Sequence, residues 1–180
     1  MKNIAVFCAS STGFDPVFSD QAKKLGRYLA LNGMTLVYGG ANRGLMGVLA
    51  DSAIENGGEV IGVIPDLIRE EEVAHTGITK LIFTKKMSQR KEEISKLADG
   101  YIALAGGFGT LDELFETLTL GQLGIESKPV GILNTKGYFD FLIRQLDVMV
   151  ASGFLHKENR NMLLVADTIE ELVSKIVKTK

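Results

Sequence analysis

Short runs of hydrophobic residues alternate along the chain with longer segments in which hydrophobic residues recur every three or four positions. The short runs are rich in β-branched residues, which is typical of strands buried on both faces of a parallel sheet. They predict strands at residues 4–8, 35–38, 60–64, 81–83, 101–104, 130–133 and 162–165.

The longer segments have the spacing of helices. In the first, Val17, Ala22, Leu25 and Leu29 recur at helical intervals before a stop signal at Asn32-Gly33. Further helices are expected at residues 45–56, 87–98, 110–123, 138–151 and 168–177. Strands that alternate with helices predict an α/β fold with a mostly parallel, Rossmann-like sheet and helices on both faces. We find no linker or repeat, so residues 1–180 are expected to form one domain.

Composition excludes several classes of protein. With 180 residues, 46% of them hydrophobic and 23% charged, the chain is expected to fold around a substantial core. The net charge of −2 gives no broad basic field to attract nucleic acid or anionic lipid. No hydrophobic run approaches the length of about 18 residues that spans a membrane. The run after Met1 is too short for a signal peptide, so a cytoplasmic location is expected.

Cysteine and histidine are scarce. Cys8 is the only cysteine, which excludes an intramolecular disulfide and a multi-cysteine metal site. His75 and His156 are the only histidines, too few for a site with three or four His or Cys ligands. We therefore expect no metal site of that kind. Cys8 is interpreted as a small buried residue at a strand end rather than as a nucleophile.

Three loops that follow predicted strands are small, polar or rich in glycine. They are residues 9–13, 39–44 and 105–110, and each leads into a predicted helix. Ligands of open α/β sheets bind at this edge, and free N–H groups at a helix start attract phosphate. The alternative is that the glycines only permit tight turns. Neither a dinucleotide fingerprint nor a P-loop occurs, which favours a mononucleotide or another small phosphate ester.

Glu113 lies next to the last of these loops. Thr110 and Glu113 have the spacing of a helix capping box, which is its structural alternative. Beside a phosphate pocket, however, a carboxylate can reach the sugar of a nucleotide. There it suits the orientation of water or the stabilisation of an oxocarbenium-like ribose.

Arg90 and Lys91 fall on the hydrophobic stripe of their helix, three and four positions after Met87. Two cations on a buried face are costly unless an anion meets them. The alternative is that both side chains reach water from the start of the helix. We favour a ligand-binding or catalytic role, because arginine binds phosphate and carboxylate in bidentate fashion.

With these residues in place, the chain resembles the LOG ("lonely guy") family of cytokinin riboside 5′-monophosphate phosphoribohydrolases. The family signature P-G-G-x-G-T-x-x-E corresponds to residues 105–113, which read A-G-G-F-G-T-L-D-E. A second signature, M-H-x-R-K, corresponds to residues 87–91. The sequence departs from these signatures at Ser88, where His is usual, and at Ala105, where Pro is usual. Serine is as suitable as any residue for a helix cap, but a contact made by the usual imidazole would be lost at Ser88.

The resemblance implies a homodimer or higher homo-oligomer that hydrolyses the N-glycosidic bond of a nucleoside 5′-monophosphate. The products would be free base and ribose 5-phosphate, and neither a metal nor a redox cofactor would be needed. By motif position, Arg90 and Glu113 would be the catalytic pair. The substrate-binding residues that the resemblance implies are Glu72, Met87, Lys91, Gly106, Gly107, Phe108, Gly109, Thr110, Leu111, Asp112 and Thr119.

The sequence thus predicts a phosphoribohydrolase acting on AMP or its N6-prenylated forms, with no nucleic acid or membrane as partner. The alternative is a non-catalytic binding protein of the same fold, such as a molybdenum-cofactor carrier or a DNA-handling protein. A carrier needs the anion crevice but not the pair of Arg90 and Glu113.

Overall fold

The computed structural model describes residues 1–66 and 73–179. Within them, seven strands form one sheet in the order β4-β3-β2-β1-β5-β6-β7, and every neighbouring pair is parallel. The strands are β1 (Asn3–Phe7), β2 (Thr35–Tyr38), β3 (Val60–Pro65), β4 (Lys80–Thr84), β5 (Gly100–Ala103), β6 (Val130–Leu133) and β7 (Leu163–Ala166). The predicted parallel α/β architecture is confirmed, and each predicted strand is displaced by at most one residue at either end.

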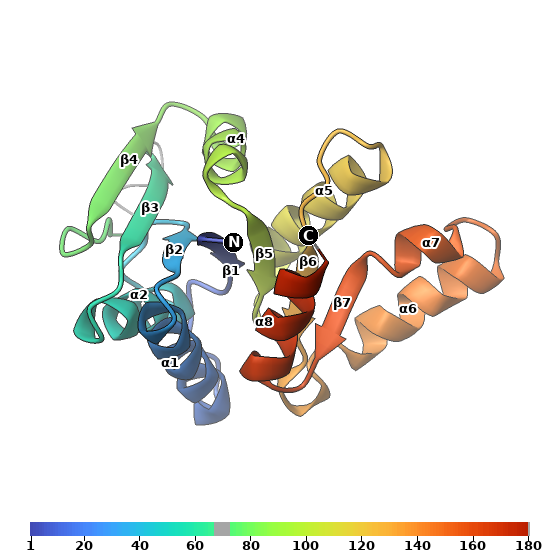
Figure 1. The fold of residues 1–180 in the computed structure, drawn as a ribbon, viewed down its shortest axis with the longest axis horizontal. Helices are drawn as coiled ribbons and strands as arrows, with labels where there is room; N and C mark the ends of the chain where they lie inside the picture. The colour runs from blue at the N-terminus through green and yellow to red at the C-terminus, as the bar shows by residue number, and fades with distance from the viewer. Residues whose placement is uncertain (67–72, 180) are drawn as a thin grey trace.

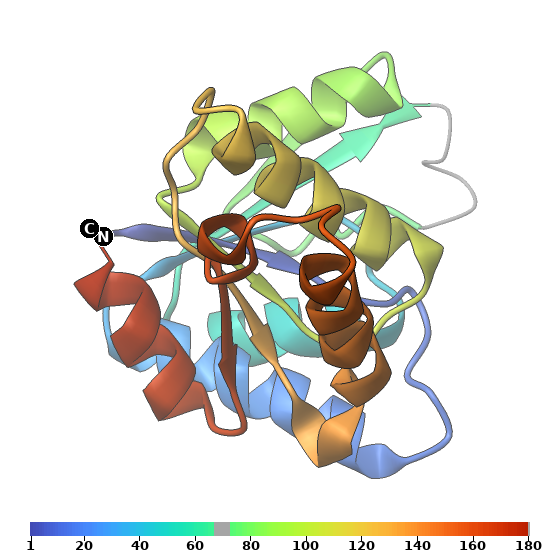
Figure 2. The ribbon, with the colours of Figure 1, turned by 90° about the vertical axis from the view of Figure 1, so that its right-hand side faces the viewer.

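Helices cover both faces of this sheet (Figures 1 and 2). One face carries α1 (Pro16–Leu31), α2 (Gly44–Glu55) and α8 (Ile169–Lys178). The other carries α4 (Met87–Leu97), α5 (Phe108–Gln122) and α6 (Asp140–Ala151), with the short α7 (Lys157–Arg160) beyond α6. A 3₁₀ turn, η2 (Thr135–Gly137), precedes α6. Helix α6 therefore begins at Asp140, two residues later than predicted. The Phe139 N–H before it donates a hydrogen bond to the Asn134 side chain.

Each face of the sheet has its own hydrophobic core, and strand β1 contributes to both. Ile4 and Val6 pack with α1, α2 and α8, whereas Ala5 and Phe7 pack with α4, α5 and α6. This division follows from the alternation of side chains along a strand. It explains why the strand sequences are continuously hydrophobic.

Strand β1 lies at the point where the strand order reverses. From β1 the chain proceeds through β2 and β3 to β4 on one side, and from β5 through β6 to β7 on the other. Connections therefore leave β1 and β5 in opposite directions, which opens a crevice at their carboxyl ends. None of the helices in residues 1–66 and 73–179 is long and apolar enough to cross a membrane.

Candidate active site

A cavity of about 290 Å³ lies in this crevice, near the lower end of the size range of small-molecule sites. We call it the main cavity. All three loops singled out in the sequence contribute to its wall, as predicted. Its lining comprises Val6, Phe7, Cys8, Ala9, Ser10, Ser11, Gly39, Met46, Arg90, Gly107, Phe108, Gly109, Thr110 and Glu113.

Backbone hydrogen bonds hold the three loops together. The Ala9 N–H donates to the Ala105 carbonyl at 3.2 Å, and the Leu45 N–H donates to the Ala9 carbonyl at 3.1 Å. Gly44 has a φ of 57°, and a Cβ at this position would lie 2.2 Å from the carbonyl carbon of Ser10. Only glycine allows this approach, so the wall of the cavity depends on backbone contact.

The start of α5 faces the main cavity without a side-chain cap. The helix begins at Phe108 with Gly107 as its N-cap, two residues earlier than predicted. Thr110 is therefore the third helical residue and is buried, so the alternative interpretation of Thr110 and Glu113 as a capping box is wrong. The uncapped N–H groups and the positive end of the helix dipole favour an anion at this point.

Arg90 is the buried cation of the main cavity, with 6% of its surface exposed. Its Nε donates to the Val63 carbonyl and its Nη2 to the Gly39 carbonyl, both at 3.1 Å. Neutral carbonyls orient the guanidinium but do not neutralise it, so the charge requires an anionic partner. The alternative that Arg90 reaches water from the helix start is wrong.

Glu113 lines the same cavity from the second turn of α5. Cys8 also lines the cavity, and the charges of Glu113 and Arg90 both affect the pKa of its thiol. Burial raises the pKa of the Cys8 thiol, the Glu113 carboxylate raises it further, and the Arg90 guanidinium opposes them. The thiol is therefore protonated at neutral pH, which agrees with its interpretation as a buried residue and not a nucleophile.

Lys91 differs from its neighbour Arg90. Its Nζ forms ion pairs with Asp112 at 2.8 Å and Glu116 at 2.9 Å. Burial opposes the charge of Lys91, but the hydrogen bonds that Lys91 donates to these two carboxylates outweigh burial and raise the pKa of Lys91. The cation of Lys91 is thus held by α5 and lies outside the lining of the main cavity.

The other residues predicted to bind substrate do not all lie at the main cavity. Leu111, Asp112 and Thr119 line a groove on the outer side of α5, together with Lys91 and Phe108. Met87 is 41% exposed at the start of α4, and neither it nor Gly106 lines the main cavity. Glu72 lies outside the described residues. The structure therefore brings together Arg90, Glu113 and residues 107–110, and separates the rest.

Two observations correct details of the sequence analysis. Ser88 is the second residue of α4, whose N-cap is Lys86, so Ser88 does not cap this helix. The main cavity is also lined by Ser10, Ser11 and Gly39, which had no individual role in the prediction although their loops were placed at the ligand edge. The position of these loops directly after β1 and β2 was the signal that could have identified them. Among the described residues, no group of three or more His, Cys, Asp or Glu side chains is arranged to hold a metal ion.

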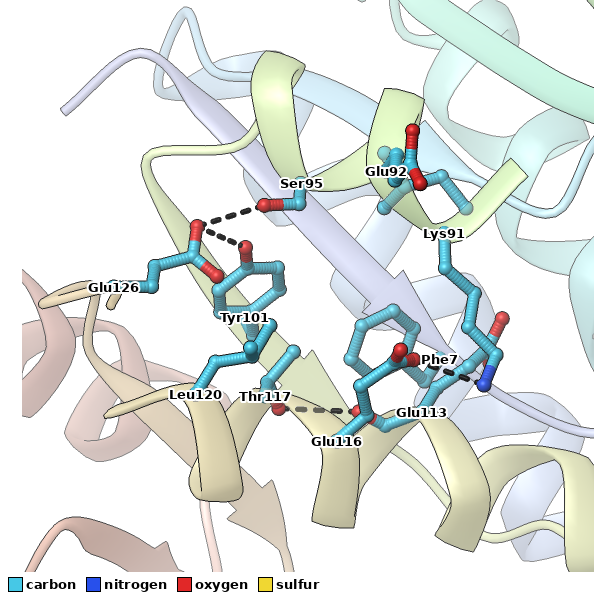
Figure 3. A pocket seen from close by; sticks show the side chains of 11 residues that line it. Phe7, Lys91, Glu92, Ser95, Tyr101, Glu113, Glu116, Thr117, Leu120 and Glu126 are labelled. Atoms are coloured by element: carbon cyan, nitrogen blue, oxygen red, sulfur yellow. Dashed lines mark hydrogen bonds and ion pairs between the residues drawn. The ribbon is translucent and has the colours of Figure 1, made fainter. Parts of the chain in front are cut away.

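A second cavity, of about 110 Å³, adjoins the main one between α4 and α5. We call it the side cavity. Phe7 and Glu113 line both cavities. Figure 3 shows Phe7, Glu113 and Lys91 at one end of the side cavity and Ser95, Tyr101 and Glu126 at the other.

Comparison with known proteins places this site in a family. A sequence model of the family described as possible lysine decarboxylase matches residues 46–176. The probable cytokinin riboside 5′-monophosphate phosphoribohydrolase LOGL1 of Oryza sativa subsp. japonica is 41% identical over 96% of this chain and 78% of its own length. The cytokinin riboside 5′-monophosphate phosphoribohydrolase LOG1 of Arabidopsis thaliana is 41% identical over 97% of this chain and 82% of its own.

Solved structures share the fold more widely. An X-ray structure from the Northeast Structural Genomics Consortium is 26% identical, with a TM-score of 0.74 and full coverage of both chains. A molybdenum cofactor carrier protein of Chlamydomonas reinhardtii superposes with a TM-score of 0.71 at 19% identity, over 99% of this chain and 97% of that one. DNA processing protein A of Helicobacter pylori superposes with a TM-score of 0.59 at 17% identity, over 98% of this chain and 80% of that one. At such identities the last two show a common fold alone.

The resemblance found in the signatures around Arg90 and Glu113 is thus confirmed by relatives that match nearly the whole of this chain. The chain belongs to the possible lysine decarboxylase family, the family of the LOG proteins.

Proposed function

We propose that the protein hydrolyses the N-glycosidic bond of a nucleoside 5′-monophosphate and releases the free base and ribose 5-phosphate. One observation carries the proposal: a buried arginine and a glutamate line one cavity beneath the uncapped start of α5. Relatives about 40% identical over nearly the whole chain are named for this reaction.

The charges of the main cavity suggest the orientation of the substrate. The phosphate binds at Gly107–Thr110, where the start of α5 supplies N–H donors. Arg90 anchors the nucleotide over the sugar, and its own orientation is fixed by two backbone carbonyls. The residues proposed for both contacts, Gly107–Thr110 and Arg90, all line the main cavity.

Glu113 supplies the chemistry of the proposed reaction. As the bond between C1′ and the base nitrogen breaks, positive charge develops on the ribose, and a nearby carboxylate stabilises it. A water oxygen then bonds to C1′, and the departing base takes up a proton from solvent, to which Glu113 returns the proton that it accepts from the attacking water. Glu113 orients that water and accepts its proton.

The test measures base release from a panel of purine and pyrimidine nucleoside 5′-monophosphates. We expect the wild type to release base from at least one of them. Glu113→Gln should lower kcat by about 100-fold or more, the loss expected from removing a group that stabilises transition-state charge. Glu158→Gln in α7 is the control for a glutamate on the exposed surface. Absence of release from every nucleotide, or equal rates for the wild type and Glu113→Gln, would refute the proposal.

A second measurement tests the alternative of a cofactor carrier. Mass spectrometry of small molecules retained on purification would show a pterin for a carrier and a nucleotide or ribose phosphate for a hydrolase. No contact of the described site favours the pterin.

We further propose that the protein works in the cytoplasm as a homo-oligomer. Phe108 at the start of α5 is 95% exposed, and Met87 at the start of α4 is 41% exposed. Large apolar side chains at the mouth of a site are typical of surfaces that a partner covers. Light scattering coupled to size-exclusion chromatography should give a mass above 19.5 kDa, the mass of one chain.

A further inference from the structure

Tyr138 connects the turn after β6 with the glycine loop that precedes α5. Its hydroxyl donates a hydrogen bond to the Gly106 carbonyl at 2.7 Å, across 32 positions of the sequence. Gly107, the next residue of the loop, lines the main cavity, whereas Tyr138 and Gly106 do not. The hydrogen bond therefore holds the peptide between the two glycines from outside the cavity.

This hydrogen bond sets the direction in which the Gly107 N–H points. The peptide is trans, so its carbonyl and its N–H point in opposite directions. Because the Gly106 carbonyl is turned toward Tyr138, the Gly107 N–H is turned away from Tyr138. Gly107 is the N-cap of α5, so this N–H lies beside the uncapped N–H groups of the first turn of the helix.

A peptide between two glycines turns over easily. Such a flip would change φ of Gly107 by about 180°, from −93° to a positive value that glycine adopts at little cost. Packing does not oppose it at Gly107, since no atom lies within 4 Å of a Cβ built there. At Gly106, by contrast, a Cβ would lie 2.1 Å from Oγ1 of Thr110, so packing requires glycine. The loop thus needs a contact that selects one orientation of the peptide.

The turn that carries Tyr138 is itself held in place. The Asn134 side chain accepts a hydrogen bond from the Phe139 N–H and donates one to Asp140, both at 2.8 Å. The Tyr138 ring packs edge to face with Phe18 of α1 and with Phe139, at centroid distances of 5.5 and 5.0 Å. The hydroxyl is therefore a fixed donor for the glycine loop.

We propose that Tyr138 is a positioning residue for the phosphate of the substrate. Its hydroxyl keeps the peptide between Gly106 and Gly107 in the orientation that presents the Gly107 N–H to a phosphate oxygen in the main cavity. This inference rests on the proposed function. Because Tyr138 acts through the loop and not on the sugar, its loss should weaken binding of the phosphate and spare the chemistry at C1′.

Tyr138→Phe removes the hydroxyl and keeps the ring. We expect KM for a nucleoside 5′-monophosphate to rise about tenfold, the size of effect that follows loss of a hydrogen bond to a charged group. The change in kcat should be less than about threefold, because only substrate binding is weakened. Tyr28→Phe, in a groove between α1 and α8, is the matched control and should behave as the wild type. A fall in kcat at constant KM, or no change in either, would contradict the proposal.

A conservative replacement separates the hydrogen bond from the ring that carries it. The non-natural residue para-aminophenylalanine in place of Tyr138 retains an N–H donor at the same point of the ring. It should bring KM to within about threefold of the wild type, unlike Tyr138→Phe. Equal KM values for these two variants would show that donation to Gly106 does not position the substrate.

Binding measured by calorimetry tests Tyr138 without hydrolysis. Tyr138→Phe should bind ribose 5-phosphate about tenfold more weakly than the wild type and bind free adenine equally well. If the wild type releases no base from any nucleotide, the proposed function fails, and these binding data alone decide the role of Tyr138. No binding of ribose 5-phosphate by the wild type, unchanged binding in Tyr138→Phe, or an equal loss for both ligands would overturn it.

Discussion

The Arg90 guanidinium donates a hydrogen bond to the Gly39 carbonyl at 3.1 Å, across 51 positions of the sequence. A Cβ built at Gly39 would lie 2.0 Å from Nη2 of Arg90. Glycine is thus the only residue that lets the end of β2 approach the guanidinium this closely. The orientation of the proposed catalytic arginine therefore depends on the absence of a side chain on the neighbouring strand.

Gly39→Ala should accordingly impair the reaction through Arg90. The added methyl group displaces the guanidinium, so we expect base release to fall by about 10- to 100-fold, the size of effect that follows a small misplacement of a catalytic group. Gly57→Ala is the matched control, because it also replaces a glycine, with a φ of 76°, in a turn with nothing within 4 Å of the new Cβ. It should cost about 1 kcal/mol of stability and leave kcat/KM unchanged. Loss of activity in both variants, or in neither, would argue against the role of Gly39.

His75 should contribute to stability far more than the other histidine. It is buried, its Nε2 is 2.9 Å from Oδ1 of Asp51 in α2, and its Nδ1 accepts a hydrogen bond from the Gly77 N–H. His75→Ala removes both hydrogen bonds of a buried side chain, so we expect a loss of about 1–3 kcal/mol in urea unfolding. His156→Ala is the control, since that side chain is exposed and makes no capping bond, and it should change stability by less than about 0.5 kcal/mol.

Glu126 should make stability depend on pH in the acidic range. Burial raises its pKa, but hydrogen bonds from Lys128, Tyr101 and Ser95 outweigh burial and hold the pKa below the ordinary value of 4.5. Because the folded state binds the proton less readily than the unfolded state, ionised Glu126 stabilises the fold above that ordinary value. This contribution is lost as the pH falls through the lower, folded pKa.

The comparison is made with Glu126→Gln by urea unfolding from pH 7 down to pH 3. At pH 7 the variant should be less stable than the wild type by about 1–2 kcal/mol, the contribution typical of hydrogen bonds to a charged group. The difference should shrink on acidification. A difference that stayed constant or widened toward low pH would show that the carboxylate is not stabilised by these three donors.

Cys8 should resist thiol reagents in the folded protein. Its side chain is buried, and its pKa is raised by burial and by Glu113, so very little thiolate is present at pH 8. Mass spectrometry should detect no labelling by a disulfide exchange reagent under native conditions and complete labelling in denaturant. Rapid labelling of the native protein would mean that the main cavity exposes a reactive thiolate.

Much of the fold can be read from local pattern in this chain. Continuous β-branched runs predict buried parallel strands, and the strands agree because both faces of the sheet are covered. Helix starts were less predictable. The first turn of α5 begins at Phe108 because the backbone at Gly107 turns into the helix, whereas the Thr110 and Glu113 spacing suggested a later start.

Adjacent residues show where local pattern fails for the site. Arg90 and Lys91 share a sequence motif, yet Arg90 is buried against β2 and β3 while Lys91 is held by carboxylates of α5. Successive side chains on a helix point about 100° apart, so neighbours in sequence meet different elements. The side cavity shows the same limit, because Ser95, Tyr101 and Glu126 come from three separate segments.

The sequence by itself determined the order of strands and helices, the three loops at the carboxyl edge and the family signatures, because each depends on residues close together in the chain. Only the tertiary structure decided that Arg90 and Glu113 line one cavity, that Gly39 makes room for the arginine, and that Glu126 closes a second cavity beside them. Those relationships depend on packing between segments far apart in the chain, which no local pattern specifies.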